Sequence, residues 1–216
     1  VLGHEDVNDF KLVSKILPHD PNKSDVISWI NHNIERSLKR LNVKKLYGFL
    51  LHRPLELLSK DGDEIYKTLL NLKNLGLISK LGISAYSPED LEKLTPYFDF
   101  DLVQSPMNFF DRRLADSGWL TNLHQRGTEV HVRSAFLQGL LLMPPNRRPD
   151  YFSPWQKLFN NFDDWLKKEN LLALQACLGF LNNFKEIDKI IVGVESVKQL
   201  SEIVTAATMN IPNVPE

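Results

Sequence analysis

The chain has 216 residues, of which 43% are hydrophobic, so it is long enough to bury one sizeable core. Its 26 basic and 27 acidic residues give a formal net charge of -1. This balance argues against nucleic-acid binding and against a polybasic membrane anchor. No apolar run reaches the roughly 20 residues of a membrane span. The single cysteine, Cys177, excludes an internal disulfide framework, so we expect a reducing compartment, the cytoplasm.

Short apolar runs that are typical of strands alternate with longer helical patterns. The strand candidates are residues 11–16, 46–51, 80–84, 101–104, 129–134 and 189–194. Between the first two, apolar residues recur at helical spacing from Val26 to Leu41, and Ser24 is the expected N-cap. A second such pattern ends before Gly76, the expected C-cap. An apolar stripe from Trp155 to Leu166 precedes the last strand, and we interpret it as packing rather than as a cofactor site.

The alternation of strands and helices predicts a parallel sheet with right-handed crossovers. Two architectures fit this pattern, an open doubly wound sheet and a (β/α) barrel. No Gly-rich fingerprint follows any strand, so the usual dinucleotide site of the open sheet is missing. Nearly every strand instead ends in a residue suited to a site: Lys15, His52, Ser84, Gln104, Ser134 and Gly193. Barrel active sites are built from several strand ends, so the barrel is favoured, with His52 at its mouth.

Each of these residues also has a purely structural interpretation. A serine at a strand end commonly caps a helix, a lysine is commonly solvated, and a histidine beside a proline is commonly half-buried scaffold. The remaining histidines show no metal-ligand spacing, and there is no GxSxG elbow and no P-loop. The evidence for a site is therefore that so many polar residues fall at the same end of the predicted sheet.

In this order and spacing, the motifs resemble the aldo-keto reductases over almost the whole chain. "KLVSK" and "LYGFLLHRP" resemble the third and fourth strands of that family. "KLGISAYSPEDL", "DLVQSPMNFFDRR", "VHVRSAFLQGLLL" and "IDKIIVGVESVKQLSEI" resemble the fifth to the eighth. The resemblance implies a (β/α)8 TIM barrel, with residues 1–216 as a single barrel domain. It also implies hydride transfer between NAD(P)H and a small carbonyl or alcohol substrate.

The resemblance further implies roles for individual residues. His52 would polarise the substrate carbonyl as a neutral imidazole, and Lys15 would lower the pKa of a neighbouring tyrosine acid. Ser84 and Gln104 would bind the nicotinamide carboxamide. The remaining cofactor-binding residues would be Arg133 under the nicotinamide, Ser134 and Gln138 at the diphosphate, and Gly193, Glu195, Ser196 and Gln199 at the adenosine end. The segment "MPPNRRPDYFSPW" would contribute to the substrate pocket through Pro145, Tyr151, Phe152 and Trp155.

Four departures from the family pattern bear on activity and on the choice of cofactor. The acid tyrosine and the aspartate that partners the lysine, which belong before the third strand, do not occur in the sequence. Ala85 replaces an asparagine, and Arg133 replaces an aromatic residue whose stacking a guanidinium can also perform. Glu195 stands where a basic residue commonly pairs with the 2′-phosphate of NADP. A carboxylate repels that phosphate and accepts bonds from a ribose hydroxyl, so either NADP or NAD remains possible.

About six of the eight expected strand–helix units are visible. A typical barrel has ~250 residues, so we expect a longer gene product, and the 216 residues alone to be inactive. The alternative is a binding or interaction protein that keeps the barrel without the chemistry. A different barrel enzyme, such as a hydrolase, is disfavoured, because Asp101 begins its strand and Glu56 lies past one, so neither forms a carboxylate pair at strand ends.

Overall fold

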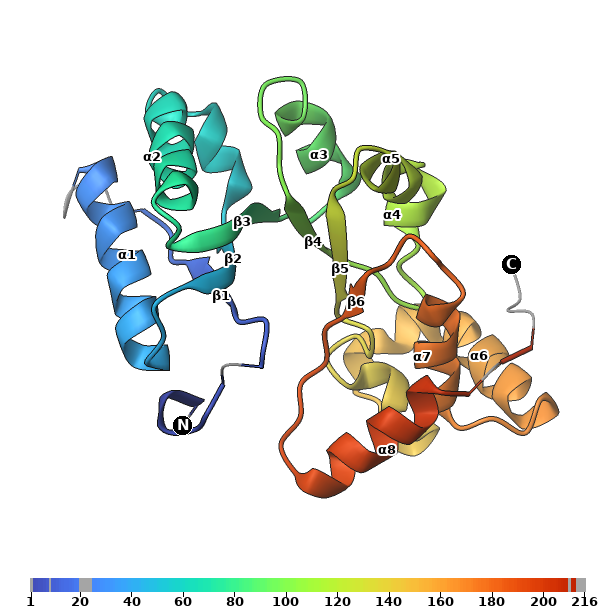
Figure 1. Cartoon of the computed structure of the whole chain (residues 1–216). Coiled ribbons are helices and arrows are strands. Elements are labelled where there is room, and N and C mark those ends of the chain that lie inside the picture. Colours follow the sequence, from blue (N-terminus) through green and yellow to red (C-terminus); the bar gives the residue numbers. More distant parts are fainter. Residues whose placement is uncertain (1, 8, 20–24, 210, 213–216) are drawn as a thin grey trace. The chain divides into compact units, whose positions relative to one another are not determined.

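The computed structural model describes residues 2–7, 9–19, 25–209 and 211–212. They form two compact units (Figure 1). Unit 1 comprises Val1–Ser105 and Leu114–Val130, and unit 2 comprises Pro106–Arg113 and His131–Glu216.

The strands of unit 1 run parallel in chain order. They are β1 (Val13–Ile16), β2 (Leu46–Leu51), β3 (Ile78–Ser84) and β4 (Leu102–Pro106). In the pairing, Lys15 lies beside Leu50, Leu50 beside Gly82, and Ser84 beside Gln104. The carboxyl ends of all four strands therefore meet at one edge, as the sequence predicts.

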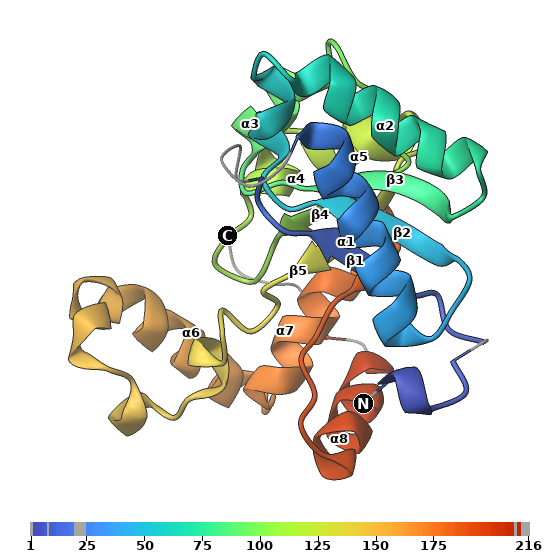
Figure 2. The same cartoon turned by 90° about the vertical axis from the view of Figure 1, so that its left-hand side faces the viewer.

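Helices cover the strands of unit 1. They are α1 (Val26–Leu41), α2 (Gly62–Asn74), α3 (Pro88–Leu94), α4 (Arg113–Asp116) and α5 (Trp119–Gln125), with the short 3₁₀ turns η1 (Leu2–His4) and η2 (Pro54–Leu58). Figure 2 shows α1 lying in front of β1 and β2. The α1 helix buries Trp29, Ile30 and Ile34 on this side.

The caps of two helices differ by one residue from the prediction. Asp25 caps α1, because its carboxylate accepts from the backbone N–H of Ser28 at 2.8 Å, whereas Ser24 lies outside the described residues. Leu75 is the C-cap of α2, and Gly76 follows it at a φ of 74°. Gly76 thus supplies the left-handed residue just beyond the cap, where glycine costs least.

Unit 2 contains most of β5 (Glu129–Arg133) and β6 (Lys189–Ile190), which pair in parallel with His131 beside Lys189. Its helices are α6 (Gln156–Lys168), α7 (Ala173–Asn182) and α8 (Val197–Ala207), and its 3₁₀ turns are η3 (Leu140–Leu142), η4 (Pro145–Arg147) and η5 (Asp150–Trp155). Phe109 is buried in this unit, with ring centroids 4.8 Å from Phe162 and 5.3 Å from Trp165. The packing interpretation of the α6 stripe is therefore confirmed for these two residues, but Trp155 is half exposed.

The strand predictions differ from the structure mainly at the ends. The strand over 46–51 is reproduced, whereas the strand expected over 189–194 has only two paired residues. After Ile191 donates its N–H to the carbonyl of Val132 at 2.7 Å, the chain leaves the sheet. Cys177 is buried in α7, and burial raises the pKa of its thiol to about 12. None of the described helices has the length and apolar character needed to cross a bilayer.

Candidate active site

Two of the predicted site residues of unit 1 are in direct contact at the carboxyl ends of the strands. Lys15 Nζ donates to Ser84 Oγ at 3.3 Å, across the space in front of β2. Ser84 is fully buried, and Gln104, its neighbour in the sheet, is 6% exposed. A cation, a hydroxyl and an amide are thus arranged side by side on three strands.

His52 lies directly after β2 and is half-buried, so its ring is partly accessible from solvent. Its Nε2 lies 3.3 Å from the hydroxyl of Tyr86, and the two rings are stacked with centroids 6.4 Å apart. The sequence analysis missed Tyr86, although its place two residues after Ser84, at the end of β3, was a usable signal. Together the imidazole and the phenol offer two groups that can donate to a carbonyl oxygen.

The turn after β3 is held by its own backbone contacts. Tyr86 donates its backbone N–H to the carboxylate of Asp90 at 2.8 Å, and Asp90 is 8% exposed. Ala85, which replaces the asparagine expected from the resemblance, is completely buried. The side chain at position 85 therefore offers no polar contact, and Tyr86 is the exposed residue of this turn.

Glu56 lies in η2, shortly after His52 in the chain. Its Oε1 accepts from the backbone N–H of His19 at 3.4 Å, while its Oε2 is buried without a hydrogen-bond partner among the described residues. Burial raises the pKa of this carboxyl above its usual value, and the His19 N–H and the Arg53 charge offset only part of that rise. Near the carboxyl ends of the strands of unit 1 there is therefore a carboxyl group, that of Glu56, with one oxygen that accepts no hydrogen bond from the described residues.

A cavity of about 490 Å³ in unit 2 brings together most of the residues predicted for the diphosphate and adenosine ends of a cofactor. It lies between the segment after β5, the segment after β6 and α8. Its lining includes Ser134, Gln138, Gly193, Glu195 and Gln199. Gly193 leaves open space where a Cβ would be, so a ligand can approach its backbone closely.

The cavity carries negative rather than positive charge. Glu195 and Glu202 line it, and none of the described lining residues is a lysine or an arginine. Ser196 caps α8 by accepting from the N–H of Gln199 at 3.2 Å, and Gln199 Oε1 accepts from the N–H of Glu195 at 2.8 Å. Ser196 and Gln199 thus shape the wall that presents the Glu195 carboxylate.

The loop after β5 has an unusual backbone. Ser134, Leu137 and Gln138 adopt left-handed φ values of 63°, 47° and 56°, and Gly139 follows at 87°. Left-handed non-glycine residues cost free energy and cluster at functional sites. Arg133, expected under the nicotinamide, donates from Nη1 to Ser134 Oγ at 3.4 Å. The predicted stacking of Arg133 stays a prediction.

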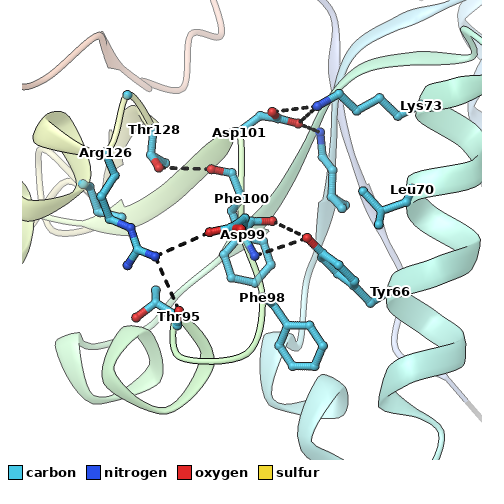
Figure 3. Close-up of a pocket in the computed structure, with 13 residues that line it drawn as sticks. Tyr66, Leu70, Lys73, Thr95, Phe98, Asp99, Phe100, Asp101, Arg126 and Thr128 are labelled. Atoms are coloured by element: carbon cyan, nitrogen blue, oxygen red, sulfur yellow. Dashed lines mark hydrogen bonds and ion pairs between the residues drawn. The ribbon is translucent and has the colours of Figure 1, made fainter.

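A cavity of about 290 Å³ in unit 1, shown in Figure 3, was not predicted and is lined by residues that directly precede β4 and β5. Lys73 donates to both carboxylate oxygens of Asp101 at 2.7 Å, and Asp101 also accepts from the N–H of Leu81 at 2.9 Å. Tyr66 donates its hydroxyl to the carbonyl of Asp99 at 2.9 Å. Because these polar groups bind one another, we interpret them as contacts that stabilise the fold rather than as a ligand site.

A second polar cluster in unit 1 joins the starts of three strands. The carboxylate of Glu129 forms an ion pair with Lys80 and accepts from the hydroxyl of Tyr47 at 2.5 Å. Burial alone would lower the pKa of Lys80, but its bonds to Glu129 and Tyr47 raise that pKa above the ordinary value. No group of His, Cys, Asp and Glu with metal-binding geometry occurs among the described residues.

Comparisons with known proteins match the chain to one family and to solved structures of similar fold. Residues 3–213 match the model of the aldo/keto reductase family. The aldo-keto reductase AKR11C1 from Bacillus halodurans is similar in its holo form, with 19% identity, a TM-score of 0.74, and coverage of 98% of this chain and 72% of that one. Its apo form gives 20% identity, a TM-score of 0.76 and coverage of 98% and 71%. No curated protein is significantly similar to the chain.

Proposed function

Because the chain belongs to the aldo/keto reductase family, we propose that it is an oxidoreductase that transfers hydride between a nicotinamide cofactor and a carbonyl or alcohol substrate. The observation that carries this proposal is the cavity of unit 2. Five residues that the family resemblance implies for cofactor binding line it together, and they come from two segments far apart in the chain. Reaction at a small carbonyl also agrees with the polar strand ends of unit 1.

Each unit, taken by itself, has polar residues of a kind that suit one part of a dinucleotide. In unit 1, Ser84 and Gln104 would hold the nicotinamide carboxamide, since a buried hydroxyl and amide are matched donors and acceptors for it. In unit 2, Ser134 and Gln138 would contact the diphosphate, Arg133 would stack under the nicotinamide, and Gly193 would admit the adenosine end. When bound, the cofactor supplies the hydride.

His52 is the residue that would hold the substrate oxygen. As a neutral imidazole it donates a hydrogen bond to that oxygen, which stabilises the negative charge that develops during reduction. Tyr86 would orient the ring through its hydroxyl. Lys15 would place a positive charge beside Ser84, close to the proposed carboxamide site.

The charges around the cavity of unit 2 favour NAD over NADP. Glu195 would accept hydrogen bonds from the ribose hydroxyls, and with Glu202 it would repel a 2′-phosphate. The absence of lysine and arginine among its described lining residues leaves that phosphate without a partner.

Location in the cytoplasm stays a prediction.

The test is a titration with NADH and with NADPH, followed by quenching of the fluorescence of the four tryptophans. We expect tighter binding of NADH, and we expect Glu195→Arg to shift the preference toward NADPH by about tenfold or more. Asp164→Arg is the matched control, because it makes the same charge change on an exposed residue of α6 outside the cavity. Equal responses of the two variants would place the effect in overall charge rather than in the cavity.

Carbonyl reduction is the second readout. Turnover that Glu195→Arg shifts from NADH to NADPH supports an enzyme. Failure to bind either cofactor at millimolar concentration contradicts the proposal. Binding without carbonyl reduction by the 216 residues alone is expected under both hypotheses, so the expected longer gene product decides between them: turnover there supports the enzyme, and its absence supports the inactive binding protein.

A further inference from the structure

We propose that a second cavity of unit 2 is a binding site for a small neutral molecule that is apolar apart from one hydrogen-bond-accepting oxygen. The cavity measures about 280 Å³ and is separate from the one assigned to the cofactor. Its main lining residues are Asn108, Phe110, Leu140, Phe152, Trp155 and Phe159. Phe152 and Trp155 belong to the segment that the family resemblance implies for the substrate pocket, but the binding proposed here requires no oxidoreductase activity.

The walls of this cavity are aromatic and fixed by contacts within unit 2. The ring of Phe159 lies 5.2 Å from that of Phe110 and 6.4 Å from that of Phe152. These two contacts connect α6 to the segment after β4 and to η5. Arg148 makes two 2.6 Å bonds to the carboxylate of Asp163 and covers the Phe159 ring at 4.7 Å. These contacts hold the walls in place without a ligand, so little ordering cost opposes binding.

The side chain of Asn108 brings a hydrogen-bond donor without a partner to the lining of the cavity. Its Oδ1 accepts from the backbone N–H groups of Phe110 and Asp111, each at 2.9 Å. Because both of those groups are donors, the side-chain oxygen must face them, which fixes the place of the nitrogen. Nδ2 is buried, and it has no hydrogen-bond partner among the described residues. A buried donor without a partner carries a desolvation cost that a ligand oxygen would relieve.

The charge of the lining selects a neutral ligand. Asp111 is the only charged residue among the described lining residues. Arg113 holds its carboxylate at 2.9 and 2.8 Å, so the acid stays ionised and repels anions. None of the described lining residues is a lysine or an arginine, so none of them attracts an anion.

The size of the cavity limits the ligand to about one ring with a short substituent, since a cavity of about 150 Å³ already holds benzene. Trp155 and Leu158 both line the cavity and are 50% and 43% exposed, so they mark its mouth. The loop with the left-handed residues separates this cavity from the cofactor cavity. Leu137 and Leu140 face this side, whereas Ser134 and Gln138 line the other.

The experiment measures binding of acetophenone, ethylbenzene and benzoate to the full chain by ligand-observed NMR titration. We expect acetophenone to bind, ethylbenzene to bind about tenfold more weakly because it has no acceptor for Asn108, and benzoate not to bind. Asn108→Leu should remove the preference for acetophenone over ethylbenzene while keeping ethylbenzene binding. Asn160→Leu makes the same change on an exposed residue of α6 outside the cavity and should leave the preference intact.

A second variant keeps the proposal testable if Asn108→Leu does not fold. Leu158→Trp enlarges a half-exposed side chain at the mouth and should abolish binding of both neutral probes, whereas Leu200→Trp, the same change on a half-exposed residue of α8 outside the lining, should not. The proposal is overturned if acetophenone and ethylbenzene bind equally to the native chain, or if Leu158→Trp leaves their binding unchanged. Since no nicotinamide is present, these outcomes are independent of the proposed activity.

Discussion

Polar side chains at the two ends of the strands in unit 1 differ in the lengths of the hydrogen bonds that they form. At the amino ends, Glu129 forms an ion pair with Lys80 and accepts from the Tyr47 hydroxyl at 2.5 Å. Asp101 accepts from Lys73 at 2.7 Å and from the Leu81 N–H at 2.9 Å. At the carboxyl ends, Lys15 meets Ser84 and His52 meets Tyr86 at 3.3 Å. These hydrogen bonds are thus shorter at the amino ends of the strands than at the carboxyl ends.

This difference separates stability from function along the length of each strand. Polar groups that satisfy one another stabilise the fold but have little capacity left for a ligand. Polar groups held by longer bonds keep that capacity, and in parallel barrels the carboxyl end is where sites are built. We therefore expect substitutions at the amino ends to change the free energy of unfolding, and those at the carboxyl ends to change cofactor binding.

The largest expected effect is at Glu129. Glu129→Ala leaves Lys80 partly buried without its carboxylate, so the free energy of unfolding should fall by about 3 kcal/mol. Urea unfolding measures this loss, and NADH affinity of the folded protein should stay unchanged. The double variant Lys80→Met, Glu129→Leu should recover most of the loss, since apolar groups of similar size replace both charges. If the double variant is as unstable as the single one, the ion pair is not the cause.

The next effect concerns the cavity in Figure 3. Asp101→Ala removes the partner of Lys73 and of the Leu81 N–H, so we expect a loss of about 2 kcal/mol in urea unfolding. Asp99→Ala is a matched control in the same cavity, because its side chain is 94% exposed and meets Arg126 only at 3.5 Å. It should change stability by less than about 0.5 kcal/mol. Similar losses in both variants would remove the distinction between supporting and solvated acids.

At the carboxyl ends of the strands, we expect a substitution to change cofactor binding more than the free energy of unfolding. Ser84→Ala removes one hydrogen-bonding group from the proposed carboxamide site, so NADH affinity should fall about fivefold, or ~1 kcal/mol. The free energy of unfolding should change by less than that, since an alanine fits the space of a serine. Fluorescence titration and urea unfolding on the same preparation compare the two quantities. A loss of stability with unchanged NADH binding would make Ser84 a structural residue.

Part of this division was predictable from the sequence. A strand ending at His52, and polar residues at the ends of other strands, follow from apolar runs closed by a polar residue, which is a local pattern. Tyr86 and the Asn108 donor were missed because their roles depend on contacts across turns that no spacing encodes. The shortness of β6 was missed for a related reason. Residues 191–194 are apolar enough for a strand, but Ile191, Val192 and Gly193 line the cavity that we propose for the cofactor.

The smallest effect tests the unsatisfied acid at the carboxyl end. Because the folded-state pKa of Glu56 is raised, the unfolded chain loses this proton near its usual pKa of 4.5, while the folded protein keeps it to higher pH. Stability should therefore decrease as pH rises from 4.5 through the folded-state pKa, and stay lower above it. Glu56→Gln removes that decrease, so its advantage in urea unfolding should grow between pH 4 and pH 7. The exposed control Glu64→Gln should show no such growth, and an advantage of Glu56→Gln that grows toward low pH would mean that the Glu56 carboxylate is stabilised in the folded protein like the acids at the amino ends.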